Sequence, residues 1–288
     1  MKKLKIILPT LNEEKAIIKV IKAIPTNALK KLGYETSVLV IDGNSKDNTI
    51  KLAKAQGAQV ITQKGKGKGD AIKTVFRELK NKTPDITIML DADYTYDPKD
   101  MPAMILPLII GDADVTIGAR EGRTHYVGNK ILTGLANIAF KNNTTDLCTG
   151  YWAFDSKAIK MIDISANGFD LETDLFAQIN KHELRIKAVT IKYRKRIGES
   201  KLRNKDAIKI MARLIRNIRD WNPIILFGTI GLTAIITALF FGARVVQDYV
   251  FNGYIQGIGT FLLTVFLGFS GLFMIGIGLI LDLIERRT

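Results

Sequence analysis

The sequence predicts an α/β domain with a mostly parallel, Rossmann-like sheet, followed by a helix at the membrane surface and a two-helix transmembrane hairpin. Three observations lead to this fold class. Segments rich in β-branched residues alternate with helical patterns over the first half of the chain. Two long stretches near the C-terminus carry almost no charge. The 42 Lys and Arg residues exceed the 28 Asp and Glu residues, and the whole formal charge of +14 lies in residues 1–222.

The predicted strands and helices of the α/β domain alternate with short connections. We expect strands at Lys5–Pro9, Ser37–Ile41, Gln59–Thr62, Ile86–Leu90 and Val115–Gly118. We expect helices at Glu13–Ile24, Ser45–Gln56 and Gly69–Lys80. Ligands of such sheets bind beyond the carboxyl ends of the strands, which is where Asp42 and Asp91 fall.

Two uncharged runs predict membrane-spanning helices. The first covers Pro223–Ala243 and the second covers Tyr249–Leu281. A helix of about 20 residues spans the roughly 30 Å hydrocarbon core of a bilayer. We therefore expect helices at about 223–246 and 255–281, joined by the short linker Gln247–Gly257. A pair of buried core helices is the alternative, but such long uncharged runs rarely occur inside a soluble domain.

The distribution of positive charge predicts the orientation. Segments rich in Lys and Arg stay on the cytoplasmic side of a membrane. The N-terminal domain and the short tail are therefore expected in the cytoplasm, and the tip of the hairpin is expected outside. The apolar run Ile6–Leu8 is too short for a cleavable signal, so we expect a multi-pass protein of the cell membrane.

The segment Asn204–Trp221 predicts an amphipathic helix. Its apolar residues recur at helical spacing: Ile208, Met211, Leu214, Ile215 and Ile218. Basic residues cover the rest of its surface, and Trp221 stands where an aromatic residue suits a membrane interface. We expect this helix on the inner leaflet, and packing on the soluble domain is the alternative. The expected organisation is a domain at 1–203, a surface helix at 204–222 and a hairpin at 223–288.

The apolar face of Tyr126–Phe140 allows the same two interpretations, since it can contact either a bilayer or the core. The composition excludes other classes of protein. A single cysteine, Cys148, rules out a disulfide framework, and only two histidines disfavour a histidine metal site. A hydrophobic content of 47% excludes a disordered chain. The positive charge requires an anionic partner, but no nucleic-acid motif is present, so we expect no nucleic acid.

Two carboxylates follow the expected strand Ile86–Leu90. Asp91 and Asp93 are two residues apart in a turn, so both can approach one divalent cation. Oxygen ligands in an open site suit Mg²⁺ or Mn²⁺ bridging a diphosphate. The pair also occurs by chance in loops. Here the preceding strand and the basic residues elsewhere in the chain favour a metal site.

Two further segments are candidates for the nucleotide. Asp42 ends a strand and can accept a hydrogen bond from a nucleobase N–H, whereas Asp47 and Thr49 are better explained as turn residues. Lys68 lies in the segment Lys64–Asp70, which alternates lysine with glycine before a helix. Glycine permits close approach of the backbone, so this segment suits a place near the nucleotide. A solvated loop is the alternative.

Other charged residues are candidates for binding phosphate and sugar. Basic residues gather after the strand at 115–118 and again before the surface helix: Arg120, Arg123, Lys130, Arg194, Lys195, Arg196, Ser200, Lys201 and Arg203. Arginine binds phosphate through two parallel hydrogen bonds. A surface patch that only attracts anionic lipid is the alternative. Glu172 and Asp174 either orient sugar hydroxyls or form the acidic start of a helix, and the sequence favours neither interpretation.

In their order these motifs resemble glycosyltransferase family 2, whose members have an A-type fold. The matching segments are Pro9–Glu13, Val40–Ser45, Asp91–Asp93, Asp146–Phe154 and Arg196–Lys201. They look most like the dolichol-phosphate mannosyltransferase type, which glycosylates polyprenyl phosphates. The resemblance covers residues 4 to about 203. The Gln-x-x-Arg-Trp signature of processive polysaccharide synthases is missing.

The resemblance implies roles by matching position. Together with Lys68, the donor site would comprise Pro9, Leu11, Glu13, Val40, Asp42, Asp91, Ala92 and Asp93. Asp91 and Asp93 would hold the metal, with Asp93 the main ligand, and Thr95 stands where the family often has a glutamine. Arg120 and Arg196 would act on the phosphates during catalysis. The acceptor phosphate site would also include Lys130, Thr133, Ser200 and Lys201.

The chemistry of a phosphate acceptor can be argued independently. A phosphomonoester has a second pKa of about 6, so at pH 7 it is largely dianionic and is already a nucleophile. The enzyme then has to position the reactants and neutralise the leaving diphosphate. Direct displacement at the anomeric carbon would invert its configuration. An acceptor hydroxyl would need a general base, for which Glu172 and Asp174 are the candidates.

We therefore expect a metal-dependent, inverting glycosyltransferase at the cytoplasmic face of the membrane. It would move one sugar from GDP-mannose or a UDP-hexose to dolichyl or polyprenyl phosphate, and the product would serve glycosylation. Two alternatives stay open. One is a glycosyltransferase that acts on a lipid hydroxyl, and the other is an inactive membrane-anchored paralogue that binds lipid.

Overall fold

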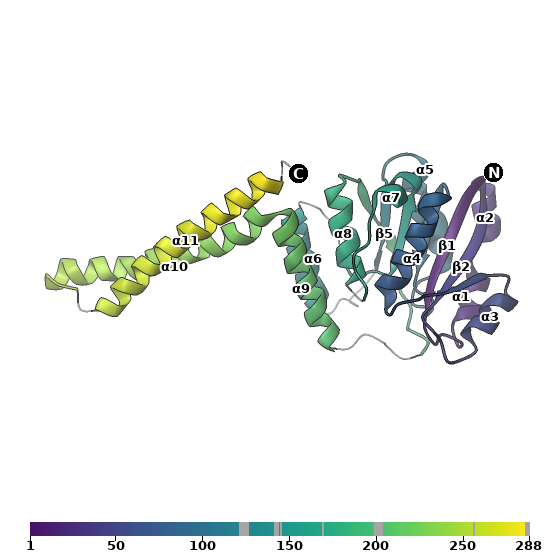
Figure 1. Cartoon of the computed structure of the whole chain (residues 1–288), viewed down its shortest axis with the longest axis horizontal. Helices are drawn as coiled ribbons and strands as arrows, with labels where there is room; N and C mark the ends of the chain where they lie inside the picture. Colours follow the sequence, from purple (N-terminus) through teal and green to yellow (C-terminus); the bar gives the residue numbers. More distant parts are fainter. Residues whose placement is uncertain are drawn as a thin grey trace. The chain divides into compact units, whose positions relative to one another are not determined.

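The computed structural model describes residues 1–120, 127–140, 144, 146–168, 170–198, 204–255 and 257–285. The chain divides into two compact units, Met1–Leu214 and Ile215–Thr288 (Figure 1). The first unit holds the sheet and the helices around it, and the second holds two long helices.

A seven-stranded sheet lies at the centre of the first unit, in the order β3-β2-β1-β4-β6-β5-β7. Its strands are β1 (Lys2–Thr10), β2 (Tyr34–Asp42), β3 (Gln59–Thr62), β4 (Ile86–Leu90), β5 (Val115–Arg120), β6 (Tyr151–Asp155) and β7 (Ile186–Ile191). Among these strands only β6 is antiparallel, to β4 and to β5. The predicted α/β class with a mostly parallel sheet is confirmed.

Central strands of the sheet are buried on both faces. Every residue of β4 is buried, as are Leu4, Ile6, Ile7 and Leu8 of β1. Near-continuous apolar runs of this kind are typical of parallel strands covered by helices on both sides. The helices of this unit are α1 (Ile17–Ala23), α2 (Thr26–Lys31), α3 (Thr49–Ala55), α4 (Lys68–Asn81), α5 (Met101–Ile109), α6 (Val127–Phe140), α7 (Ser156–Met161) and α8 (Leu171–Lys181), with a 3₁₀ turn at Pro98–Asp100.

Two helices begin later than the sequence predicts, and side chains explain both differences. The Glu13 N–H donates to the Thr49 hydroxyl at 2.8 Å, so the chain makes a turn before α1. Before α3, the Ser45 N–H donates to Asp42 Oδ2 at 2.8 Å and the Thr49 N–H donates to Asp47 Oδ1 at 3.0 Å. Asp47 therefore fixes the turn, and Thr49 begins α3, in line with the sequence interpretation of this stretch as a turn and a helix start.

The antiparallel strand β6 brings a distant loop to the carboxyl edge of the sheet. Leu90 at the end of β4 is paired with Tyr151 at the start of β6. The residues just before β6 therefore lie beside Asp91. A Cβ on Gly150 would stand 2.0 Å from Asp91 Oδ2, so any side chain there would displace this carboxylate. On the other side, Thr10 of β1 pairs with Asp42 of β2 at the same edge.

The predicted amphipathic helix is present as α9 (Asn204–Trp221). Its apolar residues divide between two sides of the helix. Ile210 and Leu214 are buried, whereas Ile208 is 73% exposed. Arg213 Nε donates to Asp170 Oδ2 at 2.8 Å, so this part of α9 is held to the start of α8. The contact of α9 with the inner leaflet stays a prediction.

Two helices of the second unit, α10 (Pro223–Asn252) and α11 (Ile258–Glu285), are long and apolar enough to cross a membrane (Figure 1). The first continues past the predicted end at Val246, so Asp248 lies within it as well as Arg244, which the predicted span already included. Gly253 has φ 75° and ends the helix in the left-handed region. The connection is therefore shorter than predicted.

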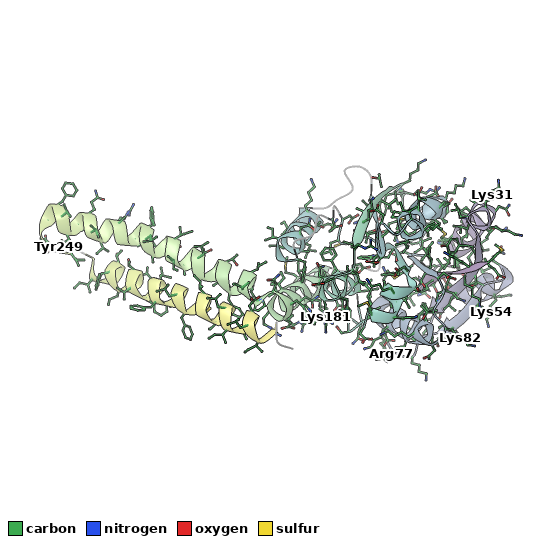
Figure 2. The ribbon with its side chains drawn as sticks, turned by 90° about the horizontal axis from the view of Figure 1, so that it is seen from above. Lys31, Lys54, Arg77, Lys82, Lys181 and Tyr249 are labelled. Atoms are coloured by element: carbon green, nitrogen blue, oxygen red, sulfur yellow. The ribbon has the colours of Figure 1, made fainter. Side chains whose placement is uncertain are left out.

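Glycines bring the backbones of α10 and α11 into contact. A Cβ on Gly231 would lie 2.5 Å from the carbonyl oxygen of Gly271, and a Cβ on Gly271 would lie 2.7 Å from that of Gly231. Figure 2 shows the two helices running alongside each other. Small residues allow this close approach, which replaces the hydrophobic effect as the main source of packing energy between helices in a membrane.

Gly271→Leu is expected to destabilise the hairpin, because its side chain would collide with the opposing backbone at a cost of about 1–3 kcal/mol. The measurement is the midpoint of thermal unfolding of the detergent-solubilised protein. Gly276→Leu is the matched control, since it lies in the same helix and a Cβ there meets nothing within 4 Å. If Gly271→Leu unfolds at the same temperature as this control, the glycine contact does not stabilise the hairpin.

Candidate active site

The two carboxylates that follow β4 lie in a tight turn. Asp93 is 5% exposed, and its Oδ1 accepts hydrogen bonds from the Thr95 N–H at 3.0 Å and the Thr95 hydroxyl at 2.5 Å. Tyr94 between them has φ 68°, in the left-handed region. This backbone conformation turns Thr95 back toward Asp93. Thr95, which the sequence analysis places with the metal ligands, therefore lies against Asp93 and hydrogen-bonds one of its oxygens.

A buried lysine joins the first carboxylate to a residue far along the chain. Lys68 Nζ lies 2.7 Å from Asp91 Oδ1 and 2.7 Å from Glu172 Oε1. Lys68 begins α4, and the Gly69 N–H donates to the Gly168 carbonyl oxygen at 3.2 Å. This end of the lysine–glycine segment is therefore fixed to the chain that leads into α8. The structure brings the predicted residues Lys68, Asp91 and Glu172 together.

Burial and charge act in opposite directions on this cluster. Burial raises the pKa of Asp91 to about 6, although the Lys68 ammonium acts to lower it. Burial alone would lower the pKa of Lys68, but the carboxylates of Asp91 and Glu172 raise it overall. Lys68 therefore stays charged at neutral pH. Burial also raises the pKa of the nearby Cys148 thiol to about 12, so this cysteine is not a thiolate nucleophile.

The two acidic candidates in α8 have different surroundings. Glu172 contacts Lys68 in the cluster described above. Asp174 instead accepts hydrogen bonds from the Ser165 N–H at 2.6 Å and the Ala166 N–H at 2.9 Å. Asp174 therefore fixes the chain before α8, whereas Glu172 lies in the site. For both residues the sequence leaves open a role in orienting sugar hydroxyls and a place at an acidic helix start, and a role of Glu172 in binding sugar stays a prediction.

The basic segment after β7 reaches the same site. Arg196 Nη1 lies 3.2 Å from Asp93 Oδ2, and its Nη2 lies 3.3 Å from Glu13 Oε1. Its Nε is buried and has no hydrogen-bond partner in the part of the chain that the structure describes. Arg196 thus joins the loop after β1 to the turn after β4. The predicted phosphate residues Ser200 and Lys201 lie outside the described residues.

The predicted nucleoside residues occupy the edge formed by β1 and β2. Asp42 is fully buried, and among the described residues its Oδ1 has no hydrogen-bond partner. Leu11 is 39% exposed at the surface, whereas Val40 is fully buried among the core residues. Ala92, in the turn between the two carboxylates, is buried as well, and Pro9 is paired with Ile41 in the sheet. The unpaired oxygen of Asp42 is a free acceptor for an N–H donor.

The arginine at the end of β5 is held by Asp146, a carboxylate that the sequence does not predict to lie in the site. Arg120 donates to Asp146 through Nε at 2.5 Å and Nη2 at 2.7 Å, and Asp146 is fully buried. The Asn129 amide donates to the same carboxylate at 2.9 Å. Asp146 begins one of the motifs that carry the family resemblance, and this was the signal for its importance.

The two residues of α6 expected at the acceptor phosphate differ in exposure. Lys130 is exposed, whereas Thr133 is buried and its hydroxyl accepts from the Leu147 N–H at 3.1 Å. Thr133 therefore links α6 to the loop before β6. Their binding to phosphate stays a prediction.

The donor set fits a divalent cation bound together with a diphosphate. Among the described residues, no group of three or more His, Cys, Asp and Glu side chains is arranged to hold a metal alone. Asp91 and Asp93 offer two carboxylates. Mg²⁺ is commonly held by one or two carboxylates, with phosphate oxygens and water completing its shell. The site therefore needs a phosphorylated ligand to complete such a metal centre.

A mostly parallel sheet with an Asp-x-Asp turn at its carboxyl edge defines a glycosyltransferase of the A-type fold. The chain belongs to glycosyltransferase family 2: the family described as "Glycosyl transferase family 2" matches residues 5–162. It is an enzyme that transfers sugars, and the predicted family and fold are confirmed.

Named relatives cover most of the chain. Glycosyltransferase AglJ of Haloferax volcanii is 31% identical over 257 residues, covering 85% of this chain and 82% of the relative. Dolichol-phosphate mannosyltransferase of Pyrococcus furiosus is 24% identical over 251 residues, covering 81% of this chain and 70% of the relative. The crystal structure of Mycobacterium tuberculosis glucosyl-3-phosphoglycerate synthase with Mn²⁺ and UDP-glucose has a TM-score of 0.61. It is 22% identical and covers 75% of this chain and 79% of that one, a likeness of fold.

Proposed function

We propose that this enzyme transfers one hexose from a nucleoside diphosphate sugar to polyprenyl phosphate, with dolichyl phosphate as the representative acceptor. The observation that carries the proposal is the cluster at the carboxyl edge of the sheet. There Lys68 pairs with Asp91 and Glu172, and Arg196 pairs with Asp93 in the same turn. The same chain carries two helices that are able to cross a membrane. A site for a sugar diphosphate and a membrane anchor together favour a lipid acceptor.

The donor half of the site can be assigned from its free acceptors and charges. The unpaired Oδ1 of Asp42 would accept an N–H of the nucleobase. Asp91 and Asp93 would hold Mg²⁺ or Mn²⁺, which when bound neutralises the negative charge of the leaving diphosphate. Arg196 would contact the same phosphates, because its guanidinium already lies beside Asp93. Glu172 would orient hydroxyls of the hexose.

The acceptor needs no general base in this proposal. A phosphomonoester is largely dianionic at pH 7, and its oxygen attacks the anomeric carbon directly. The bond from that carbon to the nucleoside diphosphate breaks as the new bond forms, so the configuration inverts. The residues of the chain position the two phosphates and shield their charges from each other. Ser200, Lys201 and Lys130 remain candidates for holding the acceptor phosphate.

Two names among the similar proteins support the choice of substrates. The Pyrococcus furiosus relative is a dolichol-phosphate mannosyltransferase, which supports a dolichyl phosphate acceptor and makes GDP-mannose one donor to test. The structure with UDP-glucose supports a UDP-hexose as the other. The positive charge of residues 1–222 supports a cytoplasmic catalytic domain, with α9 on the inner leaflet.

The test is transfer from a panel of labelled nucleotide sugars by the purified full chain. Dolichyl phosphate in detergent is the acceptor, and each donor is supplied with Mg²⁺, with Mn²⁺ or with chelator. The expected result is labelled lipid from one donor, formed only with metal. Labelled lipid in the presence of chelator would contradict the metal role. Donor binding without any transfer to dolichyl phosphate would favour a different acceptor.

The outer face of α6 is the surface we propose for the lipid. Its apolar residues form a stripe at helical spacing, with Ile131 51%, Leu135 40% and Ile138 66% exposed. The opposite face, with Leu132 and Ala136, is buried in the domain. Both interpretations of this helix therefore find support, since one face covers the core and the other is free for a bilayer. In the chain, α6 also comes after the carboxyl end of β5, and the site lies at the carboxyl ends of the strands.

Replacing Ile131 and Ile138 with asparagine is expected to raise the KM for dolichyl phosphate in vesicles several-fold, with the donor KM unchanged. The reason is the loss of apolar area that enters the bilayer. The matched control replaces Leu106 and Ile110 with asparagine as well, and these residues are 50% and 66% exposed near the end of α5. An equal change in both variants would show that α6 has no special place at the membrane.

A further inference from the structure

The segment after β7 runs beside the turn that holds Asp93. The Arg194 N–H donates to the Thr95 carbonyl oxygen at 2.7 Å, and the Ile197 N–H donates to the Asp93 carbonyl oxygen at 3.2 Å. Tyr193 forms an antiparallel bridge with Tyr96. The first part of the basic segment is therefore attached to the turn through backbone hydrogen bonds. A displacement of the segment would therefore also displace the turn.

The side chain of Arg194 makes two further contacts, one with the turn and one with a residue just after it. Its Nη2 forms an ion pair with Asp97, whose side chain is only 6% exposed. Its guanidinium carbon lies 4.7 Å from the centre of the Tyr94 ring. Stacking on an aromatic face while pairing with a carboxylate requires the flat guanidinium group, which lysine lacks.

The residue beneath this guanidinium carries the backbone strain of the turn. Tyr94 has φ 68°, in the left-handed region, which non-glycine residues rarely adopt. That conformation allows Thr95 to hydrogen-bond Asp93 through its N–H and hydroxyl. Asp97, the other residue that the Arg194 side chain contacts, is fixed in place, because its Oδ1 accepts from the Lys99 N–H at 3.1 Å at the start of the 3₁₀ turn. Arg194 therefore connects a strained residue to a fixed one.

We propose that Arg194 is a positioning residue that holds the Asp91–Thr95 turn in its ligand-binding conformation and keeps Arg196 beside Asp93. It acts through Tyr94, Asp97 and the Thr95 carbonyl, and it need not touch substrate. This inference rests on the proposed function, since the turn is taken to bind a metal with a nucleoside diphosphate. It adds a link by which the phosphate-binding segment and the metal-binding turn move as one piece.

The test compares Arg194→Gln and Arg194→Lys with Arg185→Gln. Arg185 is a matched control, because it pairs with Asp114 at 2.9 Å at the opposite edge of the sheet, before β7 begins. The readout is direct binding of Mn²⁺ in the presence of UDP or GDP, measured by electron paramagnetic resonance of the free ion. Thermal unfolding and separate kcat and KM values are measured on the same samples.

Arg194→Gln is expected to weaken Mn²⁺ binding about 10-fold or more, the usual effect of losing a residue that orients metal ligands. We expect kcat to fall and the KM for dolichyl phosphate to stay unchanged. Arg194→Lys should retain the ion pair and give an intermediate affinity. The unfolding temperature should drop no further than in Arg185→Gln, which should bind Mn²⁺ like the wild type.

Two results would overturn this role. One is wild-type Mn²⁺ affinity in Arg194→Gln, and the other is an equal loss in Arg185→Gln, which would indicate general destabilisation. A wild-type protein that binds no Mn²⁺ with either nucleotide would contradict the proposed function, and this inference would fall with it. The failures are distinguishable, because only the last one is seen in the wild type.

Discussion

Asp93→Ala is expected to lower sugar transfer at least about 100-fold, because a bound metal supplies several kcal/mol of charge stabilisation to the transition state. Asp93 is buried, and its neighbours Thr95 and Arg196 both point their polar groups at its carboxylate. Its removal therefore takes away a proposed metal ligand and the partner of Arg196, the arginine proposed to contact phosphate. The measurement is the rate of labelled lipid formation at saturating donor and Mn²⁺.

The matched control for this substitution is Asp163→Ala. Asp163 is also an aspartate paired with a basic residue, Lys80, but its side chain is 84% exposed. The Asp163→Ala variant should transfer sugar at the wild-type rate. The Asp93→Asn variant should be inactive like Asp93→Ala, since an amide oxygen does not carry the charge that the metal requires. Transfer by Asp93→Ala at more than about a tenth of the wild-type rate would exclude Asp93 as the main ligand.

Lys68→Met is expected to damage both stability and transfer. Lys68 is the cation between Asp91 and Glu172, and its side chain is only 13% exposed. Breaking a buried ion pair from one side leaves uncompensated charge and costs roughly 3 kcal/mol. Without the ammonium, the pKa of Asp91 should rise further above its ordinary value, which reduces the carboxylate available to a metal. The measurements are the thermal midpoint in detergent and the transfer rate.

Two further variants separate charge from other effects of losing Lys68. The double variant Lys68→Met with Glu172→Gln removes one negative charge as well, and should recover roughly 1–3 kcal/mol of the lost stability through the coupling of the pair. Lys80→Met removes an ion pair with the exposed Asp163, and a surface pair is worth about 0–1 kcal/mol. A Lys68→Met protein as stable as Lys80→Met would show that the Lys68 ammonium does not stabilise the fold by offsetting the charges of Asp91 and Glu172.

Local patterns were sufficient to predict part of this molecule. β3 and β4 have the predicted bounds, because short apolar runs between turn residues have little alternative to a buried strand. Asp42 and Asp91 were placed at the site because they follow strands whose ends meet at one edge. The two apolar helices were equally visible, since their length and lack of charge are properties of the sequence alone.

Long-range contacts could not be predicted in the same way. Lys68 and Glu172 are 104 residues apart, and only the fold shows that they share Asp91. Asp146 was recognised within a motif but not as the partner of Arg120, because that contact depends on the reversed direction of β6. Arg194 was seen as one member of a basic cluster. Its place over Tyr94 follows from the backbone bridge between two loops.

The central claim is that the acceptor is the phosphate of a polyprenyl lipid. The most direct measurement gives the purified enzyme one active nucleotide sugar, Mn²⁺ and either dolichyl phosphate or dolichol, and determines the mass of the lipid product. We expect one hexose added to dolichyl phosphate through a phosphodiester and none added to dolichol. A glycosylated dolichol, with dolichyl phosphate left unchanged, would contradict it and would require Glu172 to act as a general base.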